Sequence, residues 1–169
     1  MSGDDAFFRE LTLELESRGR LALATVVETS VDGILTKTLD GTITSWNPAC
    51  ERIFGYAADE VVGRNVAVLY PPEVLSQETE ILDRIRAGGS VEVREVQRVR
   101  KDGRRIWVSV SVSPVRNELG HIVGATAIKR DITDQRQQLV ARQLVRRMLR
   151  ELSQRAEGSQ DMRRELGRS

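Results

Sequence analysis

Residues 100–133 read RKDGRRIWVSVSVSPVRNELGHIVGATAIKRDIT, and this stretch decides the fold. Polar turn residues at 101–103 and 117–120 separate β-prone runs, and a further run, SVEVREVQRVR, precedes them at 90–100. The middle run alternates strictly between apolar and polar positions. One face of it carries Ile106, Val108, Val110 and Val112, and the other carries Trp107 and three serines. The pattern predicts three consecutive strands with an apolar face toward a core.

Two shorter strands are expected upstream, in GILTKTLDGTITSW at 33–46, where Asp40 and Gly41 form a strong hairpin signal. Residues 47–89 are helix-rich and are interrupted by glycines and by the Pro71-Pro72 pair. The longest helix of this region is expected at about 72–87. Two strands, a helical middle and three strands predict an α+β fold, an antiparallel sheet with its helices on one face.

A helix is also expected at each end of the chain. Residues 4–18, DDAFFRELTLELESR, place Phe7, Leu11 and Leu15 four residues apart, and Gly19 is the expected stop. One or two further helical turns are expected at 21–30. After Asp131, Thr133 is the expected N-cap of a helix whose apolar positions recur at three- and four-residue spacings, with a polar tail beyond residue 158.

The composition fits a soluble globular domain with helical extensions, since 40% of the 169 residues are hydrophobic and 30% are charged. The 26 basic and 25 acidic residues produce no net field that would favour nucleic acid. No apolar run approaches the ~20 residues that insertion across a bilayer requires. The single cysteine and the acidic start, which does not resemble a signal peptide, indicate a cytoplasmic protein.

Arginines crowd the C-terminal helix. A basic amphipathic helix can bind a membrane surface or nucleic acid, but such a face is more often the solvated side of a coiled coil. We therefore expect a coiled coil with a polar tail over 135–169, no nucleic-acid partner and no membrane insertion.

Several motifs in order resemble a PAS domain of the kind found in bacterial sensor kinases and cyclic-dinucleotide enzymes. They are W-N-P, F-G-Y, R-K-D-G, S-P-V and R-D-I-T, within DGTITSWNPACERIFGYAADEVVGRN at 40–65 and the stretch quoted above. The resemblance covers about residues 22–134 and implies a five-stranded antiparallel sheet with a helical belt around a small cavity. It divides the chain into an N-terminal amphipathic helix (1–21), the PAS domain (22–134) and a signalling helix (135–169). PAS domains sense ligands, light or redox state, dimerise and signal through flanking helices; because they are rarely enzymes, we expect no catalytic residues.

The resemblance argues against flavin and haem. In GRNVAVLY at 63–70, Val66 stands where the light-oxygen-voltage branch has its reactive cysteine. Arg98, Val108 and Lys129 stand where that branch has amides that bind the flavin ring, and an unpaired polar group costs about 1–3 kcal/mol. Glu78 stands where the haem branch has its histidine, while the only histidine, His121, is expected at the surface. No cofactor and no metal is therefore expected, although a small-molecule ligand remains open.

The residues expected to line the cavity are Trp46, Val66, Val68, Ile81, Ile85, Arg94, Arg98 and Val108. The two arginines allow three interpretations. The favoured one has them reach water at the rim; the others are internal pairing with Glu78, Glu80 or Asp83, and binding of an anionic ligand.

The signal junction is expected at Asp131, Ile132 and Thr133, where Asp131 would pair with a base and Thr133 would cap the outgoing helix. A homodimer is expected because Trp107 lies on the outer sheet face and the terminal helices carry unpartnered apolar stripes. We expect the N-terminal helix to cover the outer sheet face, within or between subunits. The candidate dimer contacts are Phe7, Leu11, Leu15, Trp107, Leu144, Met148 and Leu152.

Three interpretations of the function follow from these observations. The first is a sensory and dimerisation module that signals through its C-terminal helix to a partner such as a kinase. The second is an interaction domain whose cavity is filled by its own side chains. The third, a flavin or haem redox or light sensor, is disfavoured by the substitutions above.

Overall fold

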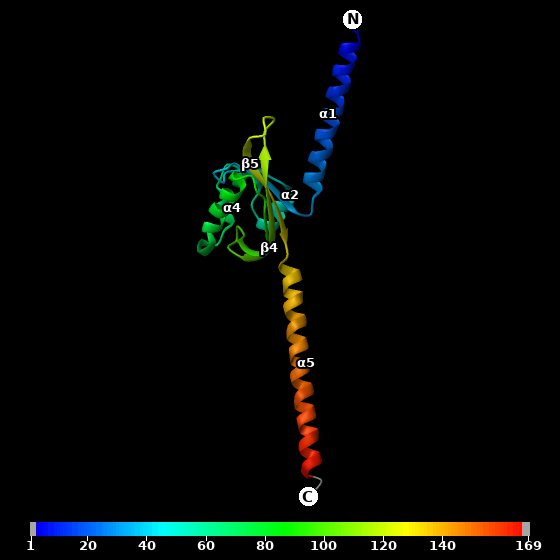
Figure 1. Cartoon of the computed structure of the whole chain (residues 1–169), viewed down its shortest axis with the longest axis vertical. Coiled ribbons are helices and arrows are strands. Elements are labelled where there is room, and N and C mark those ends of the chain that lie inside the picture. Colours follow the sequence, from blue (N-terminus) through cyan, green and yellow to red (C-terminus); the bar gives the residue numbers. More distant parts are fainter. Residues whose placement is uncertain (1–2, 167–169) are drawn as a thin grey trace. The chain divides into compact units, whose positions relative to one another are not determined.

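The computed structural model describes the backbone of residues 3–166 and the side chains of residues 13–93 and 95–154. Its strands are β1 (Gly33–Lys37), β2 (Ile43–Trp46), β3 (Val91–Val99), β4 (Arg105–Arg116) and β5 (Ile122–Asp131) (Figure 1). Its helices are α1 (Gly3–Thr29), α2 (Pro48–Phe54), α3 (Ala58–Val61), α4 (Ser76–Arg86) and α5 (Thr133–Leu166), with short 3₁₀ turns η1 (Val66–Leu69) and η2 (Pro72–Val74). The chain divides into two compact units, the first ending at Asp131 and the second beginning at Ile132.

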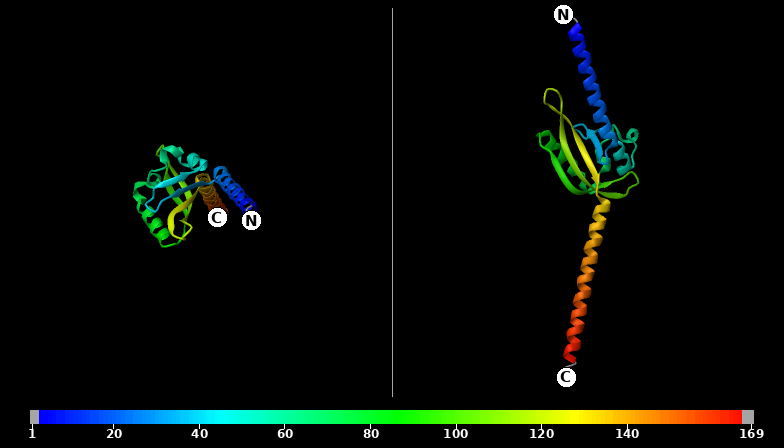
Figure 2. Two further views of the ribbon diagram at one scale, coloured as in Figure 1. Left: turned by 90° about the horizontal axis from the view of Figure 1, so that it is seen from above. Right: turned by 90° about the vertical axis from the view of Figure 1, so that its right-hand side faces the viewer.

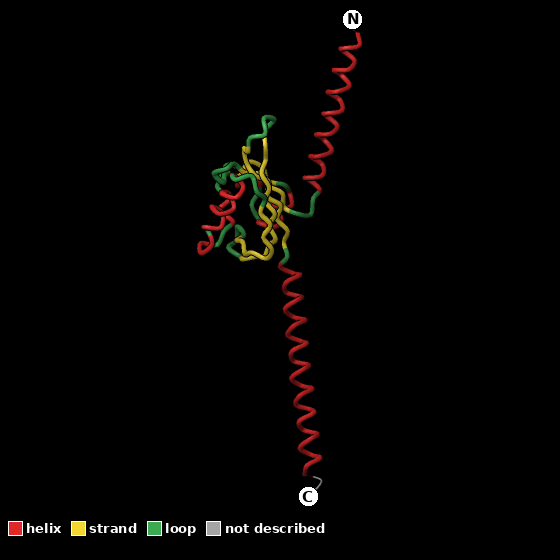
Figure 3. Tube along the Cα trace, in the orientation of Figure 1, coloured by secondary structure: helices red, strands yellow, loops and turns green. Residues whose placement is uncertain are grey.

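The five strands form one antiparallel sheet in the order β2-β1-β5-β4-β3. Figure 3 shows the strands in yellow and the helices in red. The last strand in the sequence, β5, is central and pairs with β1 on one side and with β4 on the other, so that Ala127 lies opposite both Leu35 and Val112. This arrangement confirms the predicted α+β fold with a five-stranded antiparallel sheet.

The alternation in β4 determines which face of the sheet is buried in the core. Ile106, Val108, Val110 and Val112 are all buried, as predicted, while Trp107 on the opposite face is half-buried. Helix α4 lies along the apolar face of the sheet, as Figures 1 and 2 show. Because a sheet buries one face and exposes the other, the core and any internal site lie between the sheet and this helical layer.

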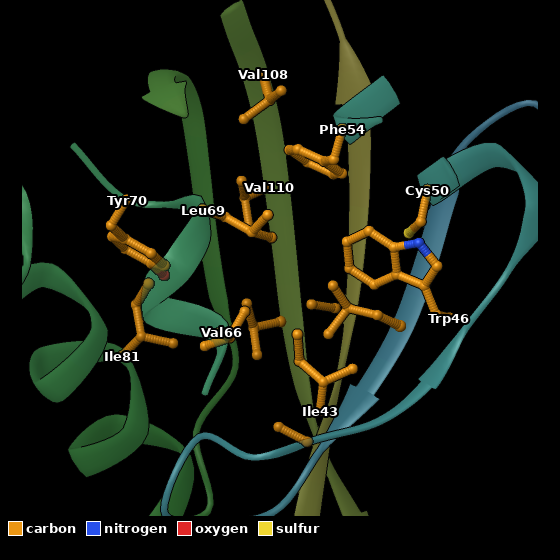
Figure 4. Packing of buried hydrophobic residues seen from close by; sticks show 14 of the residues in the cluster. Ile43, Trp46, Cys50, Phe54, Val66, Leu69, Tyr70, Ile81, Val108 and Val110 are labelled. Atoms are coloured by element: carbon orange, nitrogen blue, oxygen red, sulfur yellow. The ribbon is translucent and has the colours of Figure 1, made fainter. Parts of the chain in front are cut away.

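The core contains aromatic side chains from the end of β2 and from the helical segment that follows it. The rings of Trp46 and Phe54 lie 5.6 Å apart, and Trp46 Nε1 donates a hydrogen bond to the carbonyl of Tyr56 (3.0 Å). Cys50 lies beside them, while Tyr70 is at the other end of the cluster (Figure 4). Two polar ends, an indole N–H and a phenol, are therefore carried into an otherwise apolar interior.

Helix α1 is longer than predicted. It continues through Gly19, the expected stop, to Thr29. A glycine costs only about 1 kcal/mol in a helix, and the strong helix formers that follow it in RLALATVVET outweigh that cost. The expected boundary between the helix and the domain at residue 21 therefore falls inside α1.

The N-terminal dimer candidates are only partly described. The side chains of Phe7 and Leu11 lie outside the described residues, and Leu15 is exposed. All side chains from 13 to 29 are exposed, so this part of α1 does not cover the outer sheet face of its own chain as expected. Packing between subunits stays a prediction.

Strand β3 contains a bulge that alternation alone does not reveal. The pairing with β4 shifts between Val93 and Val96, and Glu95 adopts φ 59°, a left-handed conformation that is uncommon outside glycine. Val91 and Val93 face the core before the bulge, and Val96 and Arg98 face it afterwards. Without the extra residue, strand alternation would send Arg98 to the opposite face.

Helix α5 begins at Thr133, and the carbonyl of Ile132 accepts the first helical hydrogen bond from Arg136 (2.9 Å). The N-cap position is therefore Ile132, one residue before the expected Thr133. Leu144, Met148 and Leu152 are exposed along this helix. Within the described residues, no helix combines the length and the apolar character needed to span a bilayer.

Candidate functional site

The apolar residues predicted to line a cavity come together in the interior. Trp46, Val66, Ile81, Ile85 and Val108 are buried in one cluster, and Val68 packs against it half-buried. Figure 4 shows Trp46, Val66, Ile81 and Val108 of this set among the buried hydrophobic residues of the core. The chemically distinctive part of the interior is therefore its charge.

Four charged side chains are buried in this interior: Lys37 (3% exposed), Glu78 (6%), Arg98 (1%) and Lys129 (2%). We call these four residues the charged cluster. They come from β1, α4, β3 and β5, so the complete fold is needed to bring them together. Burying charge is costly unless it is paired, and such groups concentrate at functional sites.

Glu78 is the acceptor at the centre of the charged cluster. Its carboxylate accepts hydrogen bonds from Lys37 Nζ at one oxygen and from the Tyr70 hydroxyl at the other. Burial lowers the pKa of Lys37, while the adjacent Glu78 opposes that shift. Burial, followed by the charge of Glu78, raises the pKa of Tyr70, so the phenol is a hydrogen-bond donor at neutral pH.

Arg98 does not reach water at the rim, and the interpretation favoured from the sequence is wrong for this residue. Its guanidinium carbon lies 3.8 Å from the centroid of the Tyr70 ring, a close cation–π contact. One terminal nitrogen donates to the carbonyl of Gln97 (2.7 Å), whereas the buried Nε has no hydrogen-bond partner. The side chain of Arg94, which stands in the bulge, lies outside the described residues.

Lys129 is the cation that β5 contributes to the charged cluster, and it is 2% exposed. Its Nζ lies 5.6 Å from the centroid of Phe54 and 5.8 Å from that of Tyr70. Burial, together with the positive charges of Arg98 and Lys37, lowers its pKa to about 7. Burial also raises the pKa of the neighbouring Cys50 thiol to about 12, so the thiol supplies no negative charge near neutral pH.

Strand alternation contained a signal for the two lysines that the sequence reasoning did not use. Lys129 continues the inward positions of Ala125 and Ala127 on β5, and Lys37 continues that of Leu35 on β1. Lysines are seldom fully buried, so such positions are ordinarily assigned to strand ends at the surface.

A pocket of about 260 Å³ opens between α4 and β3, next to the charged cluster. Ile81, Val91 and Val93 form its apolar wall, and Arg98 lines it as well. Gln77, Glu80 and Arg84 from α4 complete the lining. Specific ligand sites typically combine an apolar wall with a few polar groups in this way, and drug-sized ligands occupy about 300–1,000 Å³. The volume therefore suits a small ligand.

The site fits neither haem nor the flavin chemistry considered above. Glu78, at the position of the haem ligand, is engaged by Lys37 and Tyr70, and His121 is exposed outside the pocket. Val66 is buried in η1 without a thiol, and Lys129 and Arg98 present cations where the flavin ring would need amides. Within the described residues, no group of three or more His, Cys, Asp or Glu side chains is placed to hold a metal ion.

Asn47 links α1 to the sheet and to α2. Its Oδ1 accepts from the N–H groups of Ile34 (2.9 Å) and Cys50 (3.0 Å). Its Nδ2 donates to the carbonyls of Val27 (2.9 Å) and Asp32 (3.1 Å). The W-N-P motif therefore joins the end of α1, the start of β1 and the N-terminus of α2 through a single buried amide.

A bidentate ion pair joins Asp32, the residue before β1, to Arg130 near the end of β5. Arg130, next to the predicted junction residue Asp131, donates through Nε and Nη2 to the two carboxylate oxygens of Asp32 (2.8 and 2.7 Å). The Arg130 guanidinium holds the pKa of the Asp32 carboxyl below its ordinary value. Of the predicted junction residues, Asp131 ends β5 and Thr133 begins α5.

The sequence is similar to a known domain family and to several known proteins. Residues 31–134 match the PAS domain family. The oxygen sensor protein DosP of Escherichia coli K12 is 32% identical over 104 residues, which cover 59% of this chain and 13% of that protein. The signal transduction histidine-protein kinase AtoS of the same organism is 31% identical over 108 residues, covering 64% of this chain and 17% of that protein.

A solved structure of a PAS domain has a fold similar to that of this chain. The crystal structure of a PAS domain from Colwellia psychrerythraea superimposes with a TM-score of 0.62 at 28% identity, covering 71% of this chain and 98% of that one. The chain spans less than a fifth of the length of the two curated relatives described above. Since the family match covers more than half of the residues, the chain belongs to the PAS domain family.

Proposed function

We propose that the chain is a cytoplasmic sensory and dimerisation module without catalytic activity of its own, and that it passes a signal through α5 to a kinase or another effector. Its similarity to an oxygen sensor protein and to a signal transduction histidine kinase supports a role in signal transduction. The proposal adds the route of the signal and the pairing of two chains.

The observation that carries this proposal is the character of α5. The helix starts two residues after the last strand and runs for 34 residues. Its exposed apolar residues recur at three- and four-residue spacings: Leu139, Val140, Leu144, Val145, Met148, Leu149 and Leu152. A helix of this kind gains most of its stability by burying such a stripe against a partner, and a second copy offers an identical stripe.

The contacts between the connections give a physical route for a signal. Asn47 ties the end of α1 to the start of β1, and the ion pair of Asp32 with Arg130 ties the residue before β1 to the end of β5. A change in the interior that moves β5 would therefore shift the start of α5, which is the kind of two-state element that signalling requires.

An interaction domain without a ligand is the second candidate. It is favoured by one observation, namely that the apolar residues predicted to line a cavity fill a single core cluster. The pocket beside Arg98 distinguishes the sensory module from the interaction domain, since a module that senses a ligand must have a site that binds it.

The test of the proposal is the mass of the chain in solution by light scattering. We expect a species of twice the 19.0 kDa of one chain at micromolar concentration, because the apolar stripe pairs. The double variant Leu144→Lys, Met148→Lys places two charges on the stripe and should give the mass of one chain. The matched control Gln143→Lys, Gln154→Lys adds the same charges on the opposite side of α5 and should remain dimeric. A wild-type monomer, or a dimer that survives the first double variant, would contradict the proposal.

A further inference from the structure

The charged cluster contains more positive than negative charge. Among the described residues, the buried cations are Lys37, Arg98 and Lys129, and the only buried carboxylate is that of Glu78. That carboxylate is already engaged by Lys37 and by the Tyr70 hydroxyl. Tyr70 and Cys50, whose pKa values are raised, add no negative charge at neutral pH. An interior with uncompensated positive charge is costly unless an anion balances it.

Arg98 connects this excess charge to the pocket between α4 and β3. It is 1% exposed, it lines the pocket, and its Nε has no hydrogen-bond partner. Its other contacts are weak substitutes for a counter-ion, namely a backbone carbonyl, the amide of Gln77 at 3.5 Å and the face of the Tyr70 ring. A buried guanidinium with unused donors is suited to a carboxylate, which it can bind through two parallel hydrogen bonds.

We propose that the pocket between α4 and β3 binds a small organic monocarboxylate whose charged group is bound by Arg98. This inference rests on the proposed sensory function, since it names the class of ligand that the module senses. The apolar part of the ligand lies against Ile81, Val91 and Val93, and Arg84 adds positive charge to the lining. The volume of about 260 Å³ limits the ligand to a short alkyl chain or a single ring.

The lining distinguishes a monocarboxylate from phosphate. Glu80 contributes a carboxylate to the pocket, which disfavours an anion with two negative charges. The apolar wall of Ile81, Val91 and Val93 has no side-chain hydrogen-bond donor, so it suits the hydrocarbon part of a carboxylate better than the oxygens of a phosphate.

The experiment uses the whole chain and measures binding by calorimetry and by the rise in melting temperature. The probes are butyrate, hexanoate and benzoate, each compared with its neutral amide and with inorganic phosphate. We expect at least one carboxylate to bind and to raise the melting temperature. We expect its amide and phosphate to bind roughly ten- to hundredfold more weakly, since the charged hydrogen bonds to Arg98 are absent or misplaced.

Two variants locate the site. Arg98→Met removes the guanidinium and should weaken carboxylate binding by roughly ten- to hundredfold. Val93→Phe fills the pocket without touching the charged cluster and should abolish binding even if Arg98→Met alters folding. The control Arg105→Met removes an arginine of β4 that pairs at the surface with Glu73 and should bind like the wild type.

The outcomes separate this inference from the proposed function. The inference is overturned if no carboxylate binds, if the amide or phosphate binds as tightly, or if Val93→Phe binds like the wild type. A chain that fails these tests but has twice the mass of one chain leaves the proposed function standing. A monomeric chain that binds hexanoate or benzoate through Arg98 contradicts the proposed function and leaves the ligand site standing.

Discussion

At the scale of single residues, the lowered pKa of Lys129 gives a testable dependence of stability on pH. Arg98 from β3 and Lys37 from β1 face Lys129 as cations, Glu78 from α4 faces it as an anion, and Cys50 from α2 faces it as a neutral thiol. The unfolded chain retains the Lys129 proton up to its ordinary pKa of 10.5, whereas the folded chain loses it near pH 7. Between these values the folded state binds fewer protons, so stability must rise with pH.

We therefore predict that Lys129→Met changes how stability depends on pH. Wild-type stability should gain about 1–2 kcal/mol between pH 7 and pH 8.5 from this group, because each pH unit in the window contributes at most about 1.4 kcal/mol. Lys129→Met should lack that gain and should exceed the wild type most at pH 6, where the buried lysine is charged. Urea denaturation from pH 6 to pH 8.5 measures the difference, and comparison with the wild type at each pH cancels the ionisation of unfolded Cys50 that begins near the upper end of this range.

Lys101→Met is the matched control, since Lys101 pairs with Glu60 at the surface. It should leave the pH dependence of the wild type unchanged. A Lys129→Met curve that runs parallel to the wild-type curve from pH 6 to pH 8.5 would show that Lys129 is not titrating in this window.

Glu78 should be the most sensitive carboxylate of the domain. Glu78→Gln keeps the shape of the side chain but leaves three buried cations without any buried anion among the described residues, so it should cost about 3–5 kcal/mol of the free energy of unfolding. Glu80→Gln, two residues away on α4 and exposed, should stay within about 0.5 kcal/mol of the wild type. The measurement is urea denaturation at pH 7, and equal midpoints for the two variants would refute the central role of Glu78.

The sequence identified some residues of this site and missed others. The resemblance to the flavin branch placed Arg98 at a cavity position, but its burial could not be predicted, because it depends on the bulge in β3 and on the contact of the guanidinium with Tyr70. Lys129 was compared with a flavin-binding position and then set aside, since lysine at an inward position is usually read as a strand end. Tyr70 was missed, because its role as a donor to Glu78 depends on where η1 places it against α4.

At the scale of elements, Asn47 explains how three segments become one unit. Its amide makes four hydrogen bonds, to Val27 at the end of α1, to Asp32 and Ile34 around the start of β1, and to Cys50 in α2. A buried amide with all these partners is costly to replace, because every partner left behind is unsatisfied.

We predict a graded loss of stability for two substitutions of Asn47. Asn47→Asp retains the acceptor for Ile34 and Cys50 but loses the donor to Val27 and Asp32, so it should be intermediate. Asn47→Ala loses every bond and should cost about 2–4 kcal/mol, the sum of a helix cap and unsatisfied partners. Thermal and urea denaturation give the ranking, and hydrogen exchange of residues 21–29 reports on the attachment of α1.

Asn65→Ala provides the comparison, because Asn65 also caps a helical turn through the Ala67 N–H and donates to the Asp40 carbonyl, but at an exposed position. It should cost about 1 kcal/mol or less. If Asn47→Ala were no more damaging than Asn65→Ala, the linking role of Asn47 would be disproved.

Elements were predicted best where one local pattern determined them. The alternation from Ile106 to Val112 specified β4 and its buried face, and Asp40-Gly41 marked the connection between β1 and β2. The bulge at Glu95 was not predictable, because it depends on how β3 pairs with β4. The sequence predicted a stop at Gly19 and separate helical turns at 21–30, whereas one helix continues to Thr29, since the cost of Gly19 is smaller than the favourable contribution of the helix formers after it.

At the scale of the whole molecule, the sequence indicated pairing but not its geometry. Apolar stripes predicted partners for the terminal helices, yet the register and the orientation of two chains depend on contacts that one chain does not contain. On α5, Val145, Met148 and Leu152 lie close to one line at spacings of three and four residues, the pattern of a coiled-coil seam. A parallel pair along this line would place identical residues opposite each other.

Disulfide cross-linking along α5 tests this pairing most directly. Single cysteines are placed at 145, 148 and 152 and at the control positions 143 and 150, in a chain whose buried Cys50 is replaced by alanine. The account predicts rapid formation of covalent dimers at the first three positions and little at the two controls, because only the seam brings identical residues within disulfide distance. Equal cross-linking at all five positions, or none at any, would contradict a signalling module built on paired α5 helices.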